Sequence, residues 1–521
     1  MIFVVLRLSI FFLLINSIMP FSPIILWTDA LIYLLVVLVA GFIAYVRRHE
    51  HLSMPWKRVA HSASGMSALT ILLFFLIIGL LDTVHFRPAL DHTTDQGKKV
   101  YSVEVLSVLD ILVTPLRIQM EKTYSAPLAT HLYAKDTVEL PNGEQARVFT
   151  RLEYGGAHLE NPEADRIHDI AWRTAKGLAY GFGCWGLLTA CLIFILSRRN
   201  RQGFIQSCAA IWHRTMEVPW HAILITLLII LLLIGCAMSL AIHYHVLGTD
   251  KVGQDILYQS LKSIRVALVI GTLTTLIMLP FALLLGITAG YFKGWIDDVI
   301  QYTYTTLNSI PSVLLIAAAV LMLQVYIETH PELFETIASR ADLRLLFLCI
   351  ILGITSWTGL CRLLRGEALK LRELEYIQAA HAFGVSHWRI ISRHILPNVM
   401  HLVLIATVMD FSGLVLAEAV LSYVGVGVDP SMISFGTMIN AARMEMAREP
   451  IVWWALLAAF GFMFTLVLSA NLFADAVQHA LDPRTRTLKQ RSGLSQHPAK
   501  SEKLANNKST AFTPPESASR S

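Results

Sequence analysis

The stretch from Ala222 to Ile242 limits most strongly what this chain can fold into, because its 21 residues include no charged side chain. At a rise of about 1.5 Å per residue, a helix of that length spans roughly 30 Å, the thickness of the hydrocarbon core of a bilayer. A helix of this length buried in a water-soluble protein would still need a polar edge. The stretch therefore predicts a helix that crosses a membrane.

Similar apolar segments recur along the chain, in which 55% of the residues are hydrophobic and only 15% are charged. Soluble domains carry about 25% charged residues, so much of this surface must face lipid. Met1–Ile18 could be read as a signal peptide, but Arg7 lies inside its apolar run and no small-residue cleavage site follows, so we expect a retained helix. Ten membrane-spanning helices are predicted: 2–19, 28–46, 65–84, 174–196, 219–242, 263–291, 298–325, 344–363, 399–425 and 451–475.

The basic residues indicate which ends of these spans face the cytoplasm. If the spans alternate from a cytoplasmic N-terminus, basic loops at 47–58, after the fourth span and after the eighth span all lie inside, as does the basic C-terminal tail. The outer loop Glu328–Arg344 has only two arginines against four acidic residues. Both termini are therefore predicted to be cytoplasmic. Because the basic residues follow membrane topology, nothing in them indicates nucleic-acid binding.

Residues 85–173 form one long polar segment, which this topology places outside the membrane. A strand at Thr137–Leu140, a turn at Pro141–Gly143 and a second strand at Gln145–Tyr154 are predicted within it. Residues 100–120 are apolar enough for a helix or a buried strand. We expect a small mixed α/β domain, and the alternative is a loosely ordered loop.

The inner loop between the eighth and ninth spans is predicted to form two short helices. The first, Leu371–Phe383, should end at Gly384, because glycine adopts the positive φ of a helix stop without strain. The second, Trp388–Ile395, is amphipathic, and Pro397 after it suits the first turn of the ninth span. A helix lying across the inner membrane face could transmit a push from a cytosolic partner, or it could equally be an interfacial anchor.

This loop resembles the coupling loop of binding-protein-dependent ABC importer permeases, in which a Glu-Ala-Ala triplet, a glycine and an Ile-x-Leu-Pro ending occur at fixed spacing. The residues that match are Ala379, Ala380, Gly384, Leu396 and Pro397. Gln378 stands where the family has Glu, and His394 stands where it has Ile. The ending His-Ile-Leu-Pro-Asn resembles the dipeptide, oligopeptide and nickel branch in particular.

Four further segments resemble the same branch, in the same order along the chain. They are Leu247–Asp255, Gly290–Asp297, Leu416–Gly427 and Ala480–Pro483. Gln254 departs from the pattern, since an arginine is usual there. The resemblance covers roughly residues 245–484, and nothing comparable is found in residues 1–215.

The predicted fold is an all-α polytopic membrane protein. The resemblance implies its six-helix importer core, and the apolar and polar segments add four N-terminal helices and a small extracytoplasmic α/β insertion, which depart from the usual six-helix subunit. The predicted domains are N-terminal membrane helices at 1–84, the extracytoplasmic domain at 85–173, the fourth helix and a basic loop at 174–218, the importer domain at 219–482 with its coupling loop at 371–398, and a disordered cytoplasmic tail at 483–521.

The resemblance also implies a function. In that family a cytosolic ATPase subunit holds the loop helix, and ATP binding drives alternating access through the membrane domain. This chain has no G-x-x-x-x-G-K-[ST] phosphate loop, so we expect a transport subunit that is not itself an enzyme, binds no cofactor and relies on ATP used by its partner. The implied partners are cytosolic ABC ATPase subunits, a second homologous permease, an extracytoplasmic solute-binding protein and membrane lipid.

The coupling residues implied by the match are Gln378, Ala379, Ala380, Gly384, Leu396 and Pro397. The missing glutamate at Gln378 could weaken coupling, or it could mark one half of a heteromeric pair whose partner keeps the charge. The sequence leaves open whether the substrate is a peptide, nickel or another small solute.

Two carboxylates, Asp410 and Glu418, lie within the ninth span, where charges are costly and often functional. They could form a proton or cation relay, which would make the protein an ion-coupled secondary transporter. Alternatively, Glu418 bonds across helices near the outer interface and Asp410 lines a water-filled pathway; the match of Glu418 to the family pattern favours this interpretation. His243 and His245 lack a third ligand, so no metal site is predicted.

A membrane sensor or enzyme built on residues 85–173 is the remaining hypothesis. That segment contains no Ser/His/Asp or HExxH arrangement to support catalysis.

Overall fold

The structure is a computed structural model that describes residues 21–93, 99–139, 145–200, 203–212, 216, 218–330 and 336–481. Its elements are β1 (Phe21–Ile24), α2 (Trp27–Arg48), α3 (Glu50–His61), α4 (Ala63–Thr83), β2 (His85–Thr93), β3 (Lys99–Tyr101), β4 (Leu106–Ser107), α5 (Val108–Leu112), α6 (Thr114–Ile118), β5 (Asp136–Glu139), β6 (Gln145–Val148), α7 (Pro162–Asn200), α8 (Phe204–Trp212), α9 (Trp220–Ala241), α10 (Ile256–Phe292), α11 (Trp295–Ser309), α12 (Ser312–Thr329), α13 (Ile337–Arg372), α14 (Glu375–Ala382), α15 (His387–Ile390), the π-helical turn η2 (Ile391–Ile395), α16 (Leu396–Tyr423), α17 (Phe435–Glu445) and α18 (Trp454–Leu481).

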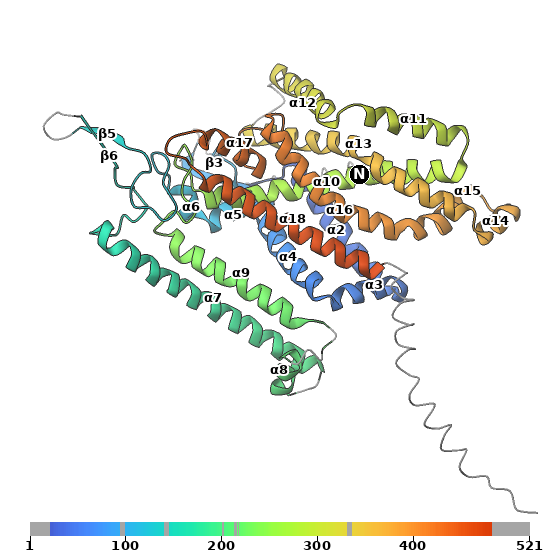
Figure 1. The fold of residues 1–521 in the computed structure, drawn as a ribbon, viewed down its shortest axis with the longest axis horizontal. Coiled ribbons are helices and arrows are strands. Elements are labelled where there is room, and N and C mark those ends of the chain that lie inside the picture. Colours follow the sequence, from blue (N-terminus) through green and yellow to red (C-terminus); the bar gives the residue numbers. More distant parts are fainter. Residues whose placement is uncertain are drawn as a thin grey trace, which may run out of the picture.

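Helices dominate this architecture, as expected for an all-α polytopic membrane protein. Within the described ranges, nine helical segments are long and apolar enough to cross a membrane. The strands and α5 and α6 lie at one end of the bundle, and α14 and α15 lie at the other (Figure 1). The segments predicted to lie outside and inside thus occupy opposite ends of the bundle, and which end faces the cytoplasm stays a prediction. The predicted span at 2–19 and tail at 483–521 fall outside the described residues.

The predicted span at 298–325 is two helices rather than one. α11 ends at Ser309 and α12 begins at Ser312, and Ile310 between them has an extended backbone. Pro311 explains the break, because it has no N–H to donate and restricts the residue before it to extended conformations. The structure therefore has a complete interruption between the two helices.

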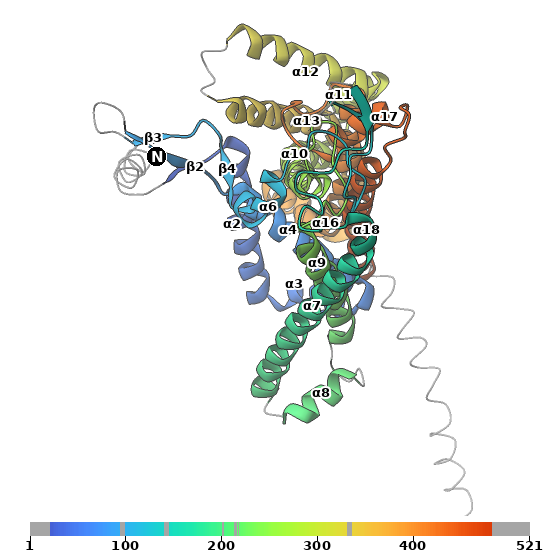
Figure 2. The same cartoon turned by 90° about the vertical axis from the view of Figure 1, so that its left-hand side faces the viewer.

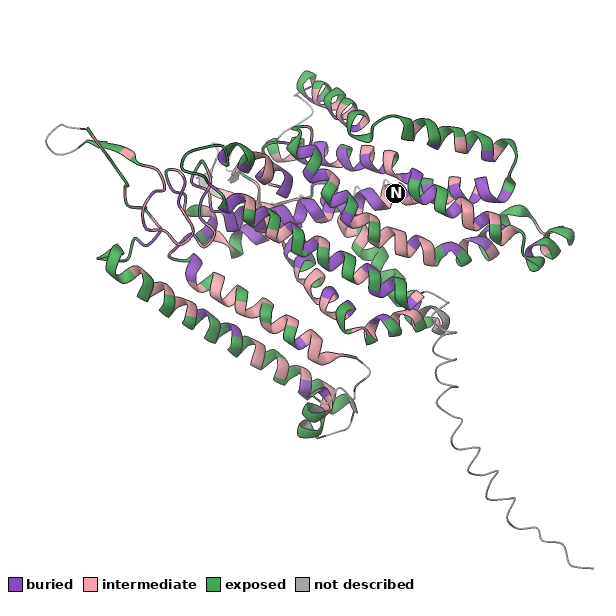
Figure 3. Cartoon of the chain, viewed as in Figure 1, coloured by how far each residue is buried: buried purple, intermediate pink, exposed green. Residues whose placement is uncertain are grey.

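The centre of the bundle is the pair α10 and α13, which pack along each other and are both rich in buried residues (Figure 3). A Cβ added at Gly286 would lie 2.8 Å from the carbonyl oxygen of Cys361, and one added at Gly290 would lie 2.6 Å from the Cβ of Ala368. Such distances leave room only for hydrogen. The two glycines therefore allow α10 and α13 to pack closely at these positions.

The N-terminal helices are packed into this bundle. α4 packs along α18 and α10, whereas α9 packs along α7 and α4. At the outer end of α2, Asp29 accepts a hydrogen bond of 2.8 Å from Arg265 of α10, which also lies 3.5 Å from Asp342 of α13. Helices outside the family-like region thus contact its centre, and the domain boundary at residue 219 stays a prediction.

The extracytoplasmic segment contains the predicted hairpin. β5 and β6 pair antiparallel, with Asp136 opposite Val148 and Glu139 opposite Gln145, and they project from the outer end of the bundle (Figure 1). The second strand ends at Val148, earlier than the predicted Tyr154. A second sheet places β2 between β1 and β4 and also pairs it with β3 (Figure 2).

The same segment is attached to the connection between α9 and α10 by backbone hydrogen bonds. The Leu128 N–H donates to the His245 carbonyl at 2.9 Å, and the Glu121 N–H donates to the Gly253 carbonyl at 3.0 Å. Because backbone groups on both sides are paired, this part of the segment is an ordered cover over the outer end of the bundle.

Candidate functional site

The inner loop forms the short helix α14 at the end of the bundle opposite the strands. The helix stops in a Schellman arrangement, in which Val385 N–H donates to the Ala380 carbonyl at 3.1 Å and Gly384 N–H donates to the His381 carbonyl at 3.0 Å. Gly384 has φ 73°. The prediction that this glycine ends the helix is confirmed. The helix begins later than predicted, at Glu375, because α13 continues through Arg372.

Three isoleucines anchor the loop to the bundle. Ile377 of α14 is 2% exposed, and Ile390 and Ile395 are fully buried. They belong to one apolar cluster with Tyr291 of α10 and Leu364 of α13. Each fully buried side chain of this kind contributes on the order of 1.5–3 kcal/mol, so the loop is firmly fixed to the helices above it.

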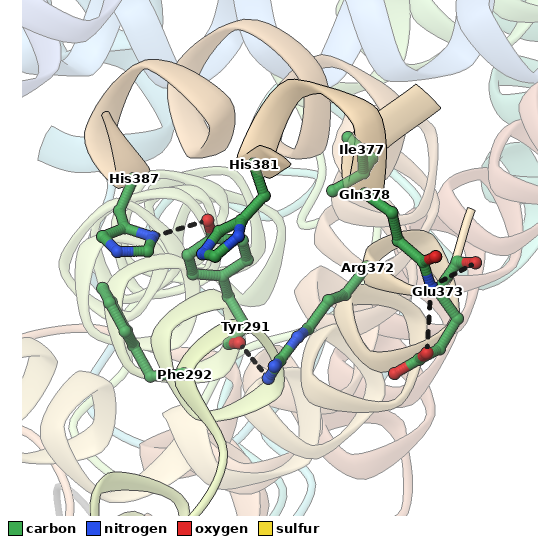
Figure 4. Close-up of a pocket in the computed structure, with 8 residues that line it drawn as sticks. All are labelled: Tyr291, Phe292, Arg372, Glu373, Ile377, Gln378, His381 and His387. Carbon is green, nitrogen blue, oxygen red and sulfur yellow. Dashed lines mark hydrogen bonds between the residues drawn. The ribbon is translucent and has the colours of Figure 1, made fainter. Parts of the chain in front are cut away.

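Polar contacts join the loop to the inner ends of α10 and α13, around a cavity of about 250 Å³ (Figure 4). The Tyr291 hydroxyl and Nδ1 of His387 are hydrogen-bonded at 2.8 Å, and Nη1 of Arg372 donates to the Tyr291 carbonyl at 2.7 Å. The ends of α10 and α13 are thus tied to each other and to α15. A displacement of the loop would reach both helices.

Gln378 lies where a carboxylate is usual in the family pattern. Its Nε2 donates to the Glu373 carbonyl at 3.3 Å and to Glu373 Oε2 at 3.5 Å (Figure 4). Glu373 also pairs with Lys293 at 2.7 Å, and this hydrogen bond lowers the pKa of the Glu373 carboxyl. A glutamate at position 378 would face this carboxylate and be repelled by it. The neutral amide therefore suits its surroundings.

The side of the loop that faces away from the bundle is exposed and partly aromatic. Phe383 is 87% exposed and Trp388 is 69% exposed, while Gln378 and Ala379 are also exposed and Ala380 is half-buried. Large exposed aromatic side chains next to small residues are typical of a surface that receives a partner.

Leu396 and Pro397 lie where the loop joins α16. The π-helical turn η2 joins α15 to α16 without a break, and Pro397 lies in the first turn of α16, as predicted. The predicted amphipathic piece and the ninth span therefore form one continuous helical path. Movement of the loop would pass directly into α16.

The two intramembrane carboxylates have different surroundings. Glu418 is 1% exposed, and its Oε1 accepts hydrogen bonds from Ser422 at 2.7 Å and from Ser434 at 2.8 Å, which links α16 to the start of α17. Asp410 is half-buried, and its carboxylate has no hydrogen bond or ion pair within the described part of the chain. No contact joins the two side chains, and their roles in transport stay predictions.

The sequence did not identify a buried ionic cluster at the outer end. Nδ1 of His245 donates to Asp255 at 2.8 Å, and its Nε2 lies 3.4 Å from Glu121. Glu121 also accepts backbone N–H groups of residues 153–155. The His243 ring instead lies against the His158 ring in a tilted arrangement, with centroids 4.6 Å apart, so the two histidines of the H-x-H pair face different partners.

Burial alone would lower the pKa of His245, but hydrogen bonding to Asp255 and Glu121 raises it to about 9. Burial acts in the opposite sense on Glu121, where hydrogen bonds from His245 and the backbone lower the pKa to about 2. The cluster therefore carries a charged histidine between two carboxylates. The sequence analysis named Asp255 within a family-like segment and His245 in the H-x-H pair, but nothing in the sequence pointed to Glu121 as the second carboxylate beside His245.

Comparison with known proteins identifies the region that contains the inner loop and the two intramembrane carboxylates. Residues 282–487 match the family model described as the binding-protein-dependent transport system inner membrane component. The oligopeptide transport system permease protein OppC of Mycobacterium tuberculosis is 32% identical over 245 residues, which covers 47% of this chain and 78% of that protein.

Two other relatives carry names from the same group. The glutathione transport system permease protein GsiD of Pectobacterium atrosepticum is 31% identical over 243 residues, covering 47% of this chain and 74% of its own. The dipeptide transport system permease protein DppC of Bacillus subtilis is 27% identical over 242 residues, which covers 46% of this chain and 69% of that protein.

Proposed function

The chain belongs to the family of binding-protein-dependent transport system inner membrane components, and we propose that it is the permease subunit of an ATP-driven importer of peptides or a related small solute. Its pathway would open alternately to the two sides of the inner membrane, driven by ATPase subunits that dock from the cytosol. The relatives named for oligopeptide, dipeptide and glutathione transport support a substrate of this class.

The observation that carries this proposal is the way α14 is held. Ile377 anchors it to the bundle, the Tyr291–His387 hydrogen bond ties the loop to α10, and η2 connects it to α16. A cytosolic subunit that moves the exposed surface around Phe383 would therefore move three membrane helices together. An interfacial anchor would not need these ties.

The remaining parts of the proposal concern assembly. The chain would be a multi-pass inner-membrane protein with both termini in the cytoplasm, paired with a second homologous permease, surrounded by lipid and supplied by an extracytoplasmic solute-binding protein. ATP would be hydrolysed by the partner, and this chain would supply no cofactor or catalytic group. The exposed apolar faces of α11 and α12, with Trp295 and Met322 each 75% exposed, support contact with lipid or a second subunit.

Replacing Phe383 by Asp tests the docking step. Because this side chain is 87% exposed, the variant should fold and accumulate normally, whereas an aromatic residue at a binding hot spot is worth about 2 kcal/mol or more. We expect roughly thirty-fold weaker capture of a phosphate-loop ATPase by the tagged protein, and a matching loss of ATP-dependent uptake.

Ile205→Asp is the matched control, because Ile205 is 82% exposed on α8 in another inner loop. It should capture the ATPase as the wild type does. Equal capture by the Phe383→Asp variant and the wild type would contradict docking at this loop.

An ion-coupled secondary transporter is the second candidate, and the unpaired Asp410 within α16 is the observation in its favour. It would not require a docked ATPase. Uptake that survives ATP depletion but collapses with the proton gradient would support it.

A further inference from the structure

A second cavity lies at the outer end of the bundle and has no part in docking an ATPase. Its volume is about 650 Å³, within the range of small-molecule binding sites. It is bounded by the extracytoplasmic segment, the connection that leads into α10, and the end of α17. The polar residues that line it are Tyr124, Asp250, Lys251, Gln259, Glu445 and Arg448.

Glu445 is the unusual member of this lining. It is 6% exposed, and its Oε1 accepts a hydrogen bond of 3.2 Å from the Tyr124 hydroxyl. Its Oε2 is buried and has no hydrogen-bond partner among the described residues. Buried polar atoms are nearly always paired, and leaving a carboxylate oxygen unpaired is costly. A site that keeps such an oxygen is suited to a ligand that donates to it.

The nearby cations do not supply that donor. Nη1 of Arg448 donates to the Tyr124 oxygen at 3.0 Å, and its guanidinium lies over the Tyr124 ring, 5.1 Å from the centroid. Lys251 is exposed, and its ammonium forms no ion pair within the described ranges. The cavity therefore has an acidic interior and two cations at its rim.

A second carboxylate adds to the negative interior. Oδ2 of Asp250 accepts from Nε2 of Gln259 at 2.6 Å. Burial is the main cause that raises the pKa of Glu445, and the charge of Asp250 adds to it, while the Tyr124 hydrogen bond and the charges of Arg448 and Lys251 only partly oppose this. A bound ammonium group would offset both effects, because it would place a positive charge beside the two carboxylates.

We propose that this cavity is a binding subsite for a small zwitterion that carries a primary ammonium and a carboxylate, as an unmodified short peptide does. Glu445 Oε2 accepts a hydrogen bond from the ammonium, and Lys251 and Arg448 face the carboxylate. The inference rests on the proposed importer function and deepens it by naming the residues that hold the two ends of the substrate. It places the subsite at the outer end of the bundle.

Glu445→Gln tests the ammonium contact, because glutamine still offers an oxygen to Tyr124 but carries no charge. The assay is uptake of labelled alanyl-alanine and of its N-acetyl form by proteoliposomes that contain the complete transporter with its ATPase and binding protein. Loss of a charge-assisted hydrogen bond should reduce ATP-dependent uptake of alanyl-alanine about ten-fold or more. Uptake of the N-acetyl form should be the same in both proteins. Glu449→Gln, an exposed charge change outside the cavity, should behave as the wild type.

Lys251→Ala provides an independent test, because this exposed side chain contributes little to folding. It should reduce uptake of alanyl-alanine but not of its C-terminal amide.

The outcomes separate the subsite from the transport function. Normal uptake of alanyl-alanine by both variants, with an active wild type, would overturn the subsite and leave the importer proposal intact. Equal losses for modified and unmodified peptides would assign Glu445 and Lys251 structural roles and also overturn it. A wild type that transports nothing when ATP is supplied would overturn the importer proposal, and the subsite with it.

Discussion

Deprotonating His245 should loosen the attachment of the extracytoplasmic segment to the bundle. This histidine is 2% exposed, and it lies between Glu121 from the segment and Asp255 at the start of α10. As long as it is protonated, two carboxylates from distant parts of the chain share its charge. A neutral imidazole would leave them facing each other without a cation.

The magnitude follows from the pKa of His245, which is raised from 6.5 to about 9. At about 1.36 kcal/mol per pKa unit, this amounts to roughly 3 kcal/mol of stability. Because folding raises the pKa of His245, its protonation stabilises the folded state fully below pH 6.5. This stabilisation is lost as the pH rises through about 9. The pKa of Glu121 is about 2, so this carboxylate stays ionised over that window and its contribution is constant.

The assay heats the protein in lipid nanodiscs at a series of pH values. Unfolding is detected as protease cleavage of the extracytoplasmic segment. Wild-type stability should fall between pH 6.5 and about 9, whereas His245→Gln should be less stable at the lower pH and independent of pH over this range. His168→Gln, at an exposed position on α7, should keep the wild-type profile. A His245→Gln variant that follows the wild-type curve, or wild-type stability that rises with pH, would refute the reasoning.

Two further predictions concern the membrane helices. In the Asp410→Asn variant, uptake should still depend on ATP and should not respond to a protonophore. If the variant lost uptake and a protonophore also stopped uptake by the wild type, the ion-coupled transporter would be favoured instead. Gly290→Leu should destabilise the protein by about 2 kcal/mol or more, because the new side chain would collide with Ala368, whereas the side chain of Gly366→Leu would point into open space. Thermal unfolding in detergent measures the stability of both variants. If the two variants lost the same stability, the close packing at Gly290 would not be the cause.

The sequence alone predicted those helices, helix ends and turns that depend on a local pattern of residues. The apolar run from Ala222 to Ile242 predicted α9 to within two residues, since hydrocarbon thickness and helix rise fix the length of a spanning segment. Gly384 predicted the end of α14, and the turn at residues 141–143 predicted the hairpin of β5 and β6. Each of these features depends on residues close together in the chain.

Side-chain contacts between segments that are distant in the chain could not be predicted from local patterns. The sequence showed Asp410 and Glu418 as two similar carboxylates, yet only the packing of α17 against α16 supplies Ser434 as a partner for Glu418.

The sequence by itself therefore determined which segments enter the membrane, which loop resembles a coupling element and where that loop's helix ends. Only the tertiary structure decided that Arg265 meets Asp29 and Asp342, that Glu121 meets His245, and that the acid Glu445 keeps an unpaired oxygen. The physical reason is that hydrophobicity and backbone preference act over a few neighbouring residues. The partner of a buried charge, in contrast, is set by which helices pack together, and helices from distant parts of the chain meet only when the whole bundle has assembled.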